Sequence, residues 1–94
     1  MLKPSGSVFG AIAHPVRRDL LDVLRESSRP LSVTDLGLRC EVSRSTASRH
    51  LDVLRGAGLV VGRRSGTAIR HELDRSAFAP IEDWLWSYLE SQCQ

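Results

Sequence analysis

The segment from Ser43 to Val60 constrains the fold of this chain more than any other part of it. Its sequence, SRSTASRHLDVLRGAGLV, begins with small polar residues and arginines, becomes apolar at a helical spacing, and ends at glycines. Ala47, Leu51 and Leu54 fall at i, i+4 and i+7, the spacing of the buried face of an amphipathic helix. Ser43 is a natural N-cap, and the glycines let the backbone leave the helix. The segment therefore predicts a helix with one packed face and one face rich in serine and arginine.

This second face is unusual for a surface that meets only water, because such helix faces favour Glu, Lys and Ala. Serine and threonine are small enough for a partner to come close, and arginine can hold phosphate or guanine with two hydrogen bonds. We interpret the face as a DNA-contacting surface; a solvated helix face is the alternative. For His50, a contact with DNA phosphate and a purely local hydrogen bond are equally compatible with the sequence. The residues concerned are Arg44, Ser45, Thr46, Ser48, Arg49 and His50.

Shorter helices are predicted before this segment. The pair His14-Pro15 separates the first two, because proline disfavours helix in the residue before it and suits the first turn of the next helix. Ser32 is expected to cap the third helix, with Leu31 in a very short strand ahead of it. The three helices are expected over residues 5–13, 15–26 and 32–40.

A β-hairpin and a last helix are predicted after it. The strands are expected over residues 59–61 and 67–73, with Arg63 and Arg64 in the turn at the tip of the hairpin. Ser76 is expected to cap a helix over residues 77–92. That helix is too apolar for a terminal surface helix, since exposed aromatic area of this kind usually marks an interface.

Positive charge is concentrated in the middle of the chain. Residues 39–75 carry eight arginines against four acidic residues, whereas residues 76–94 carry three acidic residues and no basic one. A localised positive field is typical of proteins that bind a polyanion. Twelve of the thirteen basic residues are arginine, which fits phosphate and guanine recognition, although a GC-rich coding bias would give the same preference.

The order of helices followed by a basic hairpin is that of a winged helix-turn-helix. The runs AHPVRRDLLDVLRE, LSVTDLGLRCEVSRSTASRHLDVLRGAGLVVGRRSG and IRHELD resemble the ArsR-type winged-helix repressors over about residues 8–75. The resemblance implies a mainly α fold of about five helices with a small β-hairpin. It also implies operator DNA as a partner and a homodimer formed through the first and last helices. The interface residues would be Val8, Phe9, Ile12, Phe78, Ile81, Trp84, Leu85, Tyr88 and Leu89.

The chain departs from this family where metal-sensing members bind metal. Those members carry Cys-x-Cys at the start of the third helix, where this chain has Ser32 and Thr34. The other common metal site uses Asp and His of the last helix, which here contains no histidine. We therefore expect no metal site and no cofactor, because the ligands are missing. An inducer, either a small molecule or a protein, is left open by the sequence.

Length and composition suit one small domain, which we expect to comprise residues 1–94. No apolar run approaches the ~20 residues that span a membrane, and the start does not read as a secretory signal. We therefore expect a cytoplasmic protein with no membrane partner, whose two cysteines, Cys40 and Cys93, are thiols.

Two other functions are open. The same fold could respond to thiol oxidation at Cys40 or Cys93, although Cys40 occupies a helix position suited to an apolar residue. It could also be a protein-interaction module that does not bind DNA, which the arginine-rich hairpin argues against. An enzyme is not expected. Ser48, His50 and Asp52 are spaced by two on one helix and point to different faces, so we do not expect them to form a catalytic triad.

Overall fold

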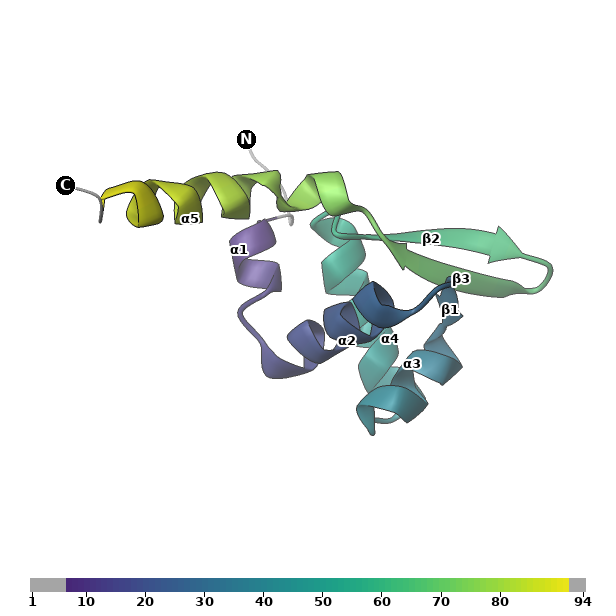
Figure 1. Ribbon diagram of the computed structural model, residues 1–94. Helices are drawn as coiled ribbons and strands as arrows, with labels where there is room; N and C mark the ends of the chain where they lie inside the picture. Colours follow the sequence, from purple (N-terminus) through teal and green to yellow (C-terminus); the bar gives the residue numbers. More distant parts are fainter. Residues whose placement is uncertain (1–6, 92–94) are drawn as a thin grey trace.

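The computed structural model describes residues 7–91, and this part contains five α-helices, a short 3₁₀ helix and one three-stranded sheet (Figure 1). The order confirms the predicted winged helix-turn-helix. The elements are α1 (Val8–Ala11), α2 (Pro15–Glu26), β1 (Leu31–Ser32), α3 (Val33–Cys40), α4 (Arg44–Gly56), β2 (Val60–Ser65), β3 (Ala68–Leu73), the 3₁₀ helix η1 (Arg75–Phe78) and α5 (Ala79–Ser91).

The first two helices are separated where the proline predicts it. Helix α1 is shorter than expected: the Ser7 hydroxyl caps it by accepting from the Gly10 N–H, and it ends at Ala11, ahead of the restricted residue before Pro15. Residues 5 and 6 of the expected helix lie outside the described part. Helix α2 begins at Pro15, where His14 Nδ1 accepts from the Val16 N–H at 3.1 Å, and its predicted bounds are confirmed.

Helices α3 and α4 form the helix-turn-helix, and each begins at its predicted serine. The Ser32 hydroxyl accepts from the Asp35 N–H, and the Ser43 hydroxyl accepts from the Thr46 N–H, both at 3.1 Å. The chain turns between the two helices at Glu41, which adopts a left-handed conformation with φ of 59°. These local hydrogen bonds fix where α4 starts.

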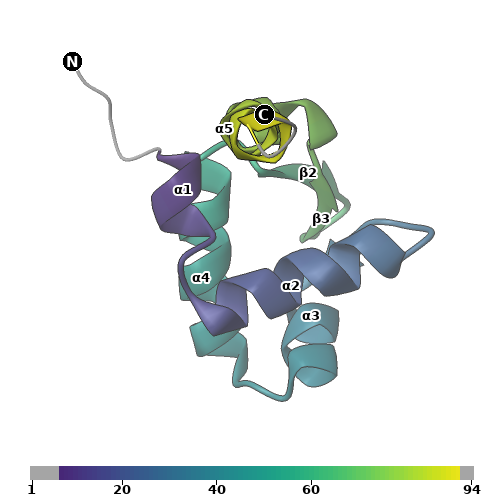
Figure 2. The ribbon, with the colours of Figure 1, turned by 60° about the vertical axis from the view of Figure 1, so that its left-hand side comes forward.

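The core is built mainly from leucines that come from every element around α4. Ala47, Leu51 and Leu54 are fully buried, which confirms the predicted packed stripe of α4. In Figure 2, α4 lies against α1 and α2 while α3 packs below α2. Burying one face of α4 on all these neighbours leaves its opposite face outside. The other leucines with no exposed area are Leu20, Leu31, Leu36 and Leu59.

The hairpin is longer than expected, and its turn lies elsewhere. All strands pair antiparallel in the order β1-β3-β2, and β2 continues to Ser65, which pairs with Ala68. The two-residue turn is therefore Gly66-Thr67, and the expectation of Arg63 and Arg64 at the tip is wrong. Gly66 adopts φ of +64°, a conformation that glycine reaches without steric cost and that tight hairpin turns require.

The last helix also begins differently from the prediction. Asp74, not Ser76, is the N-cap: its carboxylate accepts from the N–H and the hydroxyl of Ser76, and the η1 turn follows and leads into α5. The expected end at residue 92 lies outside the described part. Figure 1 shows α5 extending away from the domain on the side opposite the hairpin. Its aromatic residues stay exposed there, although Trp84 rests edge-on against Phe9 of α1 at a ring-centroid distance of 5.8 Å.

Candidate nucleic-acid interface

The outer face of α4 carries most of the residues predicted to contact DNA. Arg44, Ser45, Ser48 and Arg49 are all exposed, on the side opposite the buried stripe. Thr46 differs, because it is half-buried and its hydroxyl accepts from Ser43 at 2.9 Å within the N-cap. The Ser45 hydroxyl also lies 3.2 Å from that of Ser43, so Arg44, Ser48 and Arg49 form the part of this face that is not engaged at the helix start.

A groove of about 360 Å³ separates this face of α4 from the hairpin. Arg44, Ser48 and Arg55 line it from α4, and Thr67 and Ile69 line it from the hairpin. The start of α3 closes one end with Ser32, Val33 and Thr34. Sequence analysis missed Arg55, Thr34 and Thr67 as lining residues. The position of Thr34 could have been inferred, since it is the second residue after the predicted N-cap Ser32 and so lies at the start of α3.

One buried histidine fixes the hairpin against α4. Arg55 donates from Nη1 to Nε2 of His71 at 3.0 Å, so the ring must carry its hydrogen on Nδ1, which donates to the Leu31 carbonyl at 3.1 Å. His71 is only 3% exposed, and this burial, followed by the nearby Arg55 charge, lowers its pKa below the usual value. Arg55 also binds the Asp52 carboxylate. Two walls of the groove are thus joined through one side chain.

A glycine lies beneath this contact. Gly62 of β2 pairs with His71, and a Cβ atom placed on Gly62 would lie 3.1 Å from Ile69 and 3.5 Å from the Arg55 side chain. The contact with Ile69 would be tight, whereas the distance to Arg55 is that of ordinary van der Waals packing. Arg55 and His71 therefore pack directly over the backbone of Gly62, and a larger residue there would first have to displace Ile69.

The two hairpin arginines point to opposite faces of the sheet, because successive residues of a strand alternate. Arg64 pairs with Ile69 and shares the face of His71, which is the face toward α4. Arg63 lies on the other face and forms an ion pair with Glu72. In the described part of the chain, Arg64 has no such carboxylate partner. Only Arg64 therefore extends the positive charge of the groove.

Known proteins share this fold. Residues 12–63 match the family model described as a helix-turn-helix domain. Over 80 residues the chain is 35% identical to the HTH-type transcriptional regulator Rv2034 of Mycobacterium tuberculosis, covering 82% of this chain and 73% of that protein. The structure of this chain is similar to that of the homodimeric winged helix-turn-helix DNA-binding domain of Mb0332 from Mycobacterium bovis, a possible ArsR-family transcriptional regulator. The TM-score is 0.69 and the sequence identity 27%, and the match covers 89% of this chain and 80% of that domain. The chain belongs to the ArsR family of winged helix-turn-helix transcriptional regulators.

Membership of the ArsR family confirms the predicted function class, a DNA-binding regulator of transcription. The chain is also 37% identical over 73 residues to the HTH-type transcriptional repressor SmtB of M. tuberculosis. That match covers 78% of this chain and 53% of SmtB, so the chain spans about half the length of that relative.

His50 lies at the flank of the ArsR-type reading helix and not on its outer face. Its ring contacts that of His14, at the start of α2, with centroids 4.4 Å apart. Burial lowers the pKa of His50, and His14, Arg17 and Arg49 lower it further because their positive charges repel its protonated form. A neutral, locally packed ring is therefore the state that these surroundings favour.

Ser32 and Thr34 occupy the positions at which metal-sensing members of the family carry cysteine ligands. Ser32 uses its hydroxyl to cap α3, and Thr34 lines the groove. Among residues 7–91, no group of three or more His, Cys, Asp or Glu side chains is placed to bind a metal ion. Within the same residues, every helix is too short or too polar to cross a membrane.

The Cys40 thiol lies in surroundings that disfavour its reactive form. Cys40 ends α3 partly buried, and burial raises the pKa of its thiol, as do the nearby carboxylates of Asp19 and Asp22. The thiolate is the form that reacts with oxidants, so these surroundings make Cys40 a poor sensor. Cys93 lies outside the described residues.

Proposed function

We propose that this chain is a homodimeric repressor that binds double-stranded operator DNA through the surface formed by the exposed face of α4 and the hairpin. The observation that carries the proposal is the Arg55–His71 contact, which holds the exposed face of α4 and the hairpin as two walls of one site. A fixed distance between two elements lets them engage neighbouring parts of a duplex at the same time.

In this proposal, residues of α4 contact bases, and residues of the hairpin and of α3 contact the DNA backbone. Arg44, Ser45, Ser48 and Arg49 are exposed near the start of α4, from where recognition helices read base edges in the major groove. Arg64, on the face toward α4, would bind the backbone or the adjacent minor groove, and Thr34 and Thr67 would donate to phosphates. Arg63, Thr46 and His50 become secondary, since each is already engaged inside the protein.

The dimer is proposed to form through α1 and α5, as the family resemblance implies. Leu85, Tyr88 and Leu89 are about half exposed on the apolar side of α5, which supports an interface there. Other predicted interface residues are already partly used inside the protomer: Phe78, Val8 and Ile12 pack against the core. The solved domain of Mb0332 is homodimeric, in keeping with this assignment.

The remaining assignments follow from the repressor proposal. We propose that residues 1–94 act as one DNA-binding domain in the cytoplasm, with no catalytic role for Ser48, His50 and Asp52. The thiol-responsive alternative is disfavoured at Cys40 by its raised pKa. The alternative of a protein-interaction module that does not bind DNA is disfavoured, because it would not explain why Arg49 and Arg64 are exposed beside the groove.

Selection of duplexes from random DNA, followed by a mobility-shift assay with the selected sequence, tests the proposal. We expect one recurring sequence with two related half-sites, because a twofold dimer reads DNA twice. Arg49→Glu should abolish the shift without changing the dimer, whereas Arg39→Glu, an equal charge change at the end of α3, should have a smaller effect. Recovery of no preferred sequence would contradict the repressor proposal, and loss of binding after mild peroxide would favour the thiol-responsive alternative.

A further inference from the structure

A second hollow lies away from the groove, between the first two helices and the end of the hairpin. Its volume is about 570 Å³, within the range of small-molecule sites. It is lined from α2 and the residues before it on one side, and from β3 and η1 on the other. None of the residues predicted to read DNA lines it.

The floor of this cavity is made of core side chains that the protein leaves partly uncovered. Ile12, Leu73 and Phe78 pack against the buried core yet remain partly exposed, and Leu21 lies beside them. Covering apolar surface stabilises a protein by roughly 25 cal/mol per Å². An apolar group of suitable size would therefore gain free energy by entering the cavity.

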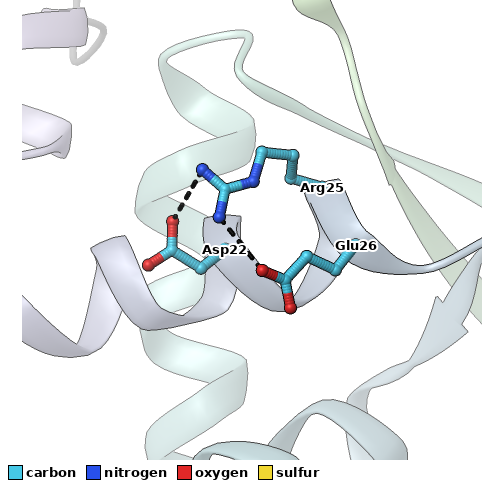
Figure 3. A network of polar contacts seen from close by, with 3 residues as sticks. All are labelled: Asp22, Arg25 and Glu26. Atoms are coloured by element: carbon cyan, nitrogen blue, oxygen red, sulfur yellow. Dashed lines mark hydrogen bonds and ion pairs between the residues drawn. The ribbon is translucent and has the colours of Figure 1, made fainter.

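The rim carries charges, and arginine predominates. Figure 3 shows the Arg25 guanidinium bound to both Asp22 and Glu26, with N–O distances of 3.6 and 3.2 Å, so these charges satisfy one another. Arg18 is partly engaged, because its Nη1 donates to the Ile12 carbonyl at 2.8 Å. Arg75 is exposed at the opposite side of the cavity, and its side chain makes neither a hydrogen bond nor an ion pair with any residue from 7 to 91.

One carboxylate, Asp19, also lines the rim. It lines the neighbouring hollow beside Cys40 as well, and it is close enough to that thiol to raise its pKa. The cavity thus meets three guanidinium groups and two carboxylates, of which Asp22 is already paired. With Glu26, which also binds Arg25, the charges around the cavity balance, so the positive charge offered to a ligand is local: it is the Arg75 guanidinium, which no described residue binds, with the remaining donors of Arg18 across the opening.

We propose that this cavity binds a small organic carboxylate with a compact apolar body. The body covers Leu73 and Phe78, and the carboxylate meets Arg75 at the rim. Arginine holds carboxylates with paired, charge-assisted hydrogen bonds, which are stronger than those between neutral groups. An uncharged molecule of the same shape would gain only the apolar contact, and a cation would meet the guanidinium groups unfavourably.

Isothermal titration calorimetry on the full chain tests the site with naphthalene-2-carboxylate as the probe. Two molecules of similar shape serve as controls: 2-naphthylmethanol, which is neutral, and 2-naphthylmethylamine, which is cationic. We expect saturable binding of one carboxylate per chain, with an affinity at least about tenfold higher than that of either control. Arg75→Glu should weaken the carboxylate by about tenfold or more, whereas Arg29→Glu, the same charge change outside the cavity, should leave affinity within about twofold.

Chemical-shift changes on the protein locate the bound probe. We expect the largest changes at Ile12, Leu73 and Phe78, and small ones at Trp86 on α5. Equal affinity for the alcohol or the amine, equal losses in the two arginine variants, or shifts centred on α5 would each overturn the proposal. Absence of saturable binding would overturn it as well, and if contacts between protomers in the dimer covered Leu73 and Phe78, a second copy of the chain would be the occupant.

Discussion

Arg55 and His71, sixteen residues apart in the chain, meet through a 3.0 Å hydrogen bond that joins the reading helix to the hairpin. Since guanidinium can only donate, the Nε2 atom of His71 must accept, and the ring must be neutral. The other ring nitrogen holds the Leu31 carbonyl of β1. One imidazole therefore links α4, β3 and β1 in the core of the winged fold.

Replacement of this ring should destabilise the domain. His71→Phe keeps an aromatic ring but removes both hydrogen bonds, leaving the Leu31 carbonyl without its partner. We expect the free energy of unfolding to fall by about 1–3 kcal/mol, as for other buried polar groups left unsatisfied. Urea denaturation measures the change, and Arg64→Ala, an exposed substitution on the same sheet, should stay within about 0.5 kcal/mol. Equal stabilities of His71→Phe and the original protein would contradict the proposed link.

The same residue should make stability depend on pH. Burial lowers the pKa of His71 in the folded protein, whereas the unfolded chain binds a proton near the usual value of 6.5. Below that value the unfolded state holds more protons, so the stabilising contribution is complete above about pH 6.5 and is lost as pH falls through the folded pKa. We expect a lower free energy of unfolding at about pH 5 than at about pH 8, and a smaller drop in His71→Phe. His50, whose pKa is also lowered, should account for part of the remaining drop.

Local features of this fold could be predicted from the sequence because they depend on neighbouring residues. Ser32 and Ser43 cap their helices through hydrogen bonds three residues away, and Leu51 and Leu54 repeat the helical spacing. The exposed face of α4 followed from the same periodicity. The start of α5 was missed because Asp74 and Ser76 are both good caps, and the earlier one begins the turn.

The rest depended on pairing between distant segments. The Arg-Arg-Ser-Gly run has the composition of a turn, but the register Ser65 to Ala68 places the turn at Gly66-Thr67. The ion pair of Arg63 and the buried position of His71 follow from that register. The alternation of the strand places His71 on the same face as Ile69 and Leu73, but its partners lie sixteen and forty residues away, so no local pattern indicated the hydrogen bonds that bury it.

DNA binding should weaken steeply with salt. Two protomers that each bring Arg44, Arg49 and Arg64 to the DNA place six positive charges near the phosphates and would displace about six counterions, which gives a slope of roughly −5 for log K against log salt concentration. Arg64→Ala should make the slope less steep by about two in the dimer, and Arg63→Ala should leave it nearly unchanged because Glu72 already binds that charge. Retained binding with a slope near zero would rule out the electrostatic role of these arginines.

The dimer should depend on the apolar side of α5. Leu85 is 47% exposed in the protomer, so its truncation removes little that stabilises the single chain. We expect Leu85→Ala to weaken dimerisation by about 2 kcal/mol, as loss of a buried interface anchor does. Sedimentation equilibrium measures the effect, with Asp83→Ala, on the opposite side of the helix, as a control. An unchanged dimer affinity in Leu85→Ala would place the interface elsewhere.

The central claim is that α4 reads the sequence while the hairpin holds the backbone, and fluorescence anisotropy tests it on operator and random DNA at one fixed salt concentration. An arginine on guanine contributes ~1–3 kcal/mol of discrimination, whereas a phosphate contact strengthens binding to all sequences about equally. We predict that Arg49→Ala narrows the difference between operator and random DNA. Arg64→Ala should lower both affinities together and preserve their ratio. A ratio that collapses in Arg64→Ala and survives in Arg49→Ala would contradict the account, because the hairpin would then be the reading element.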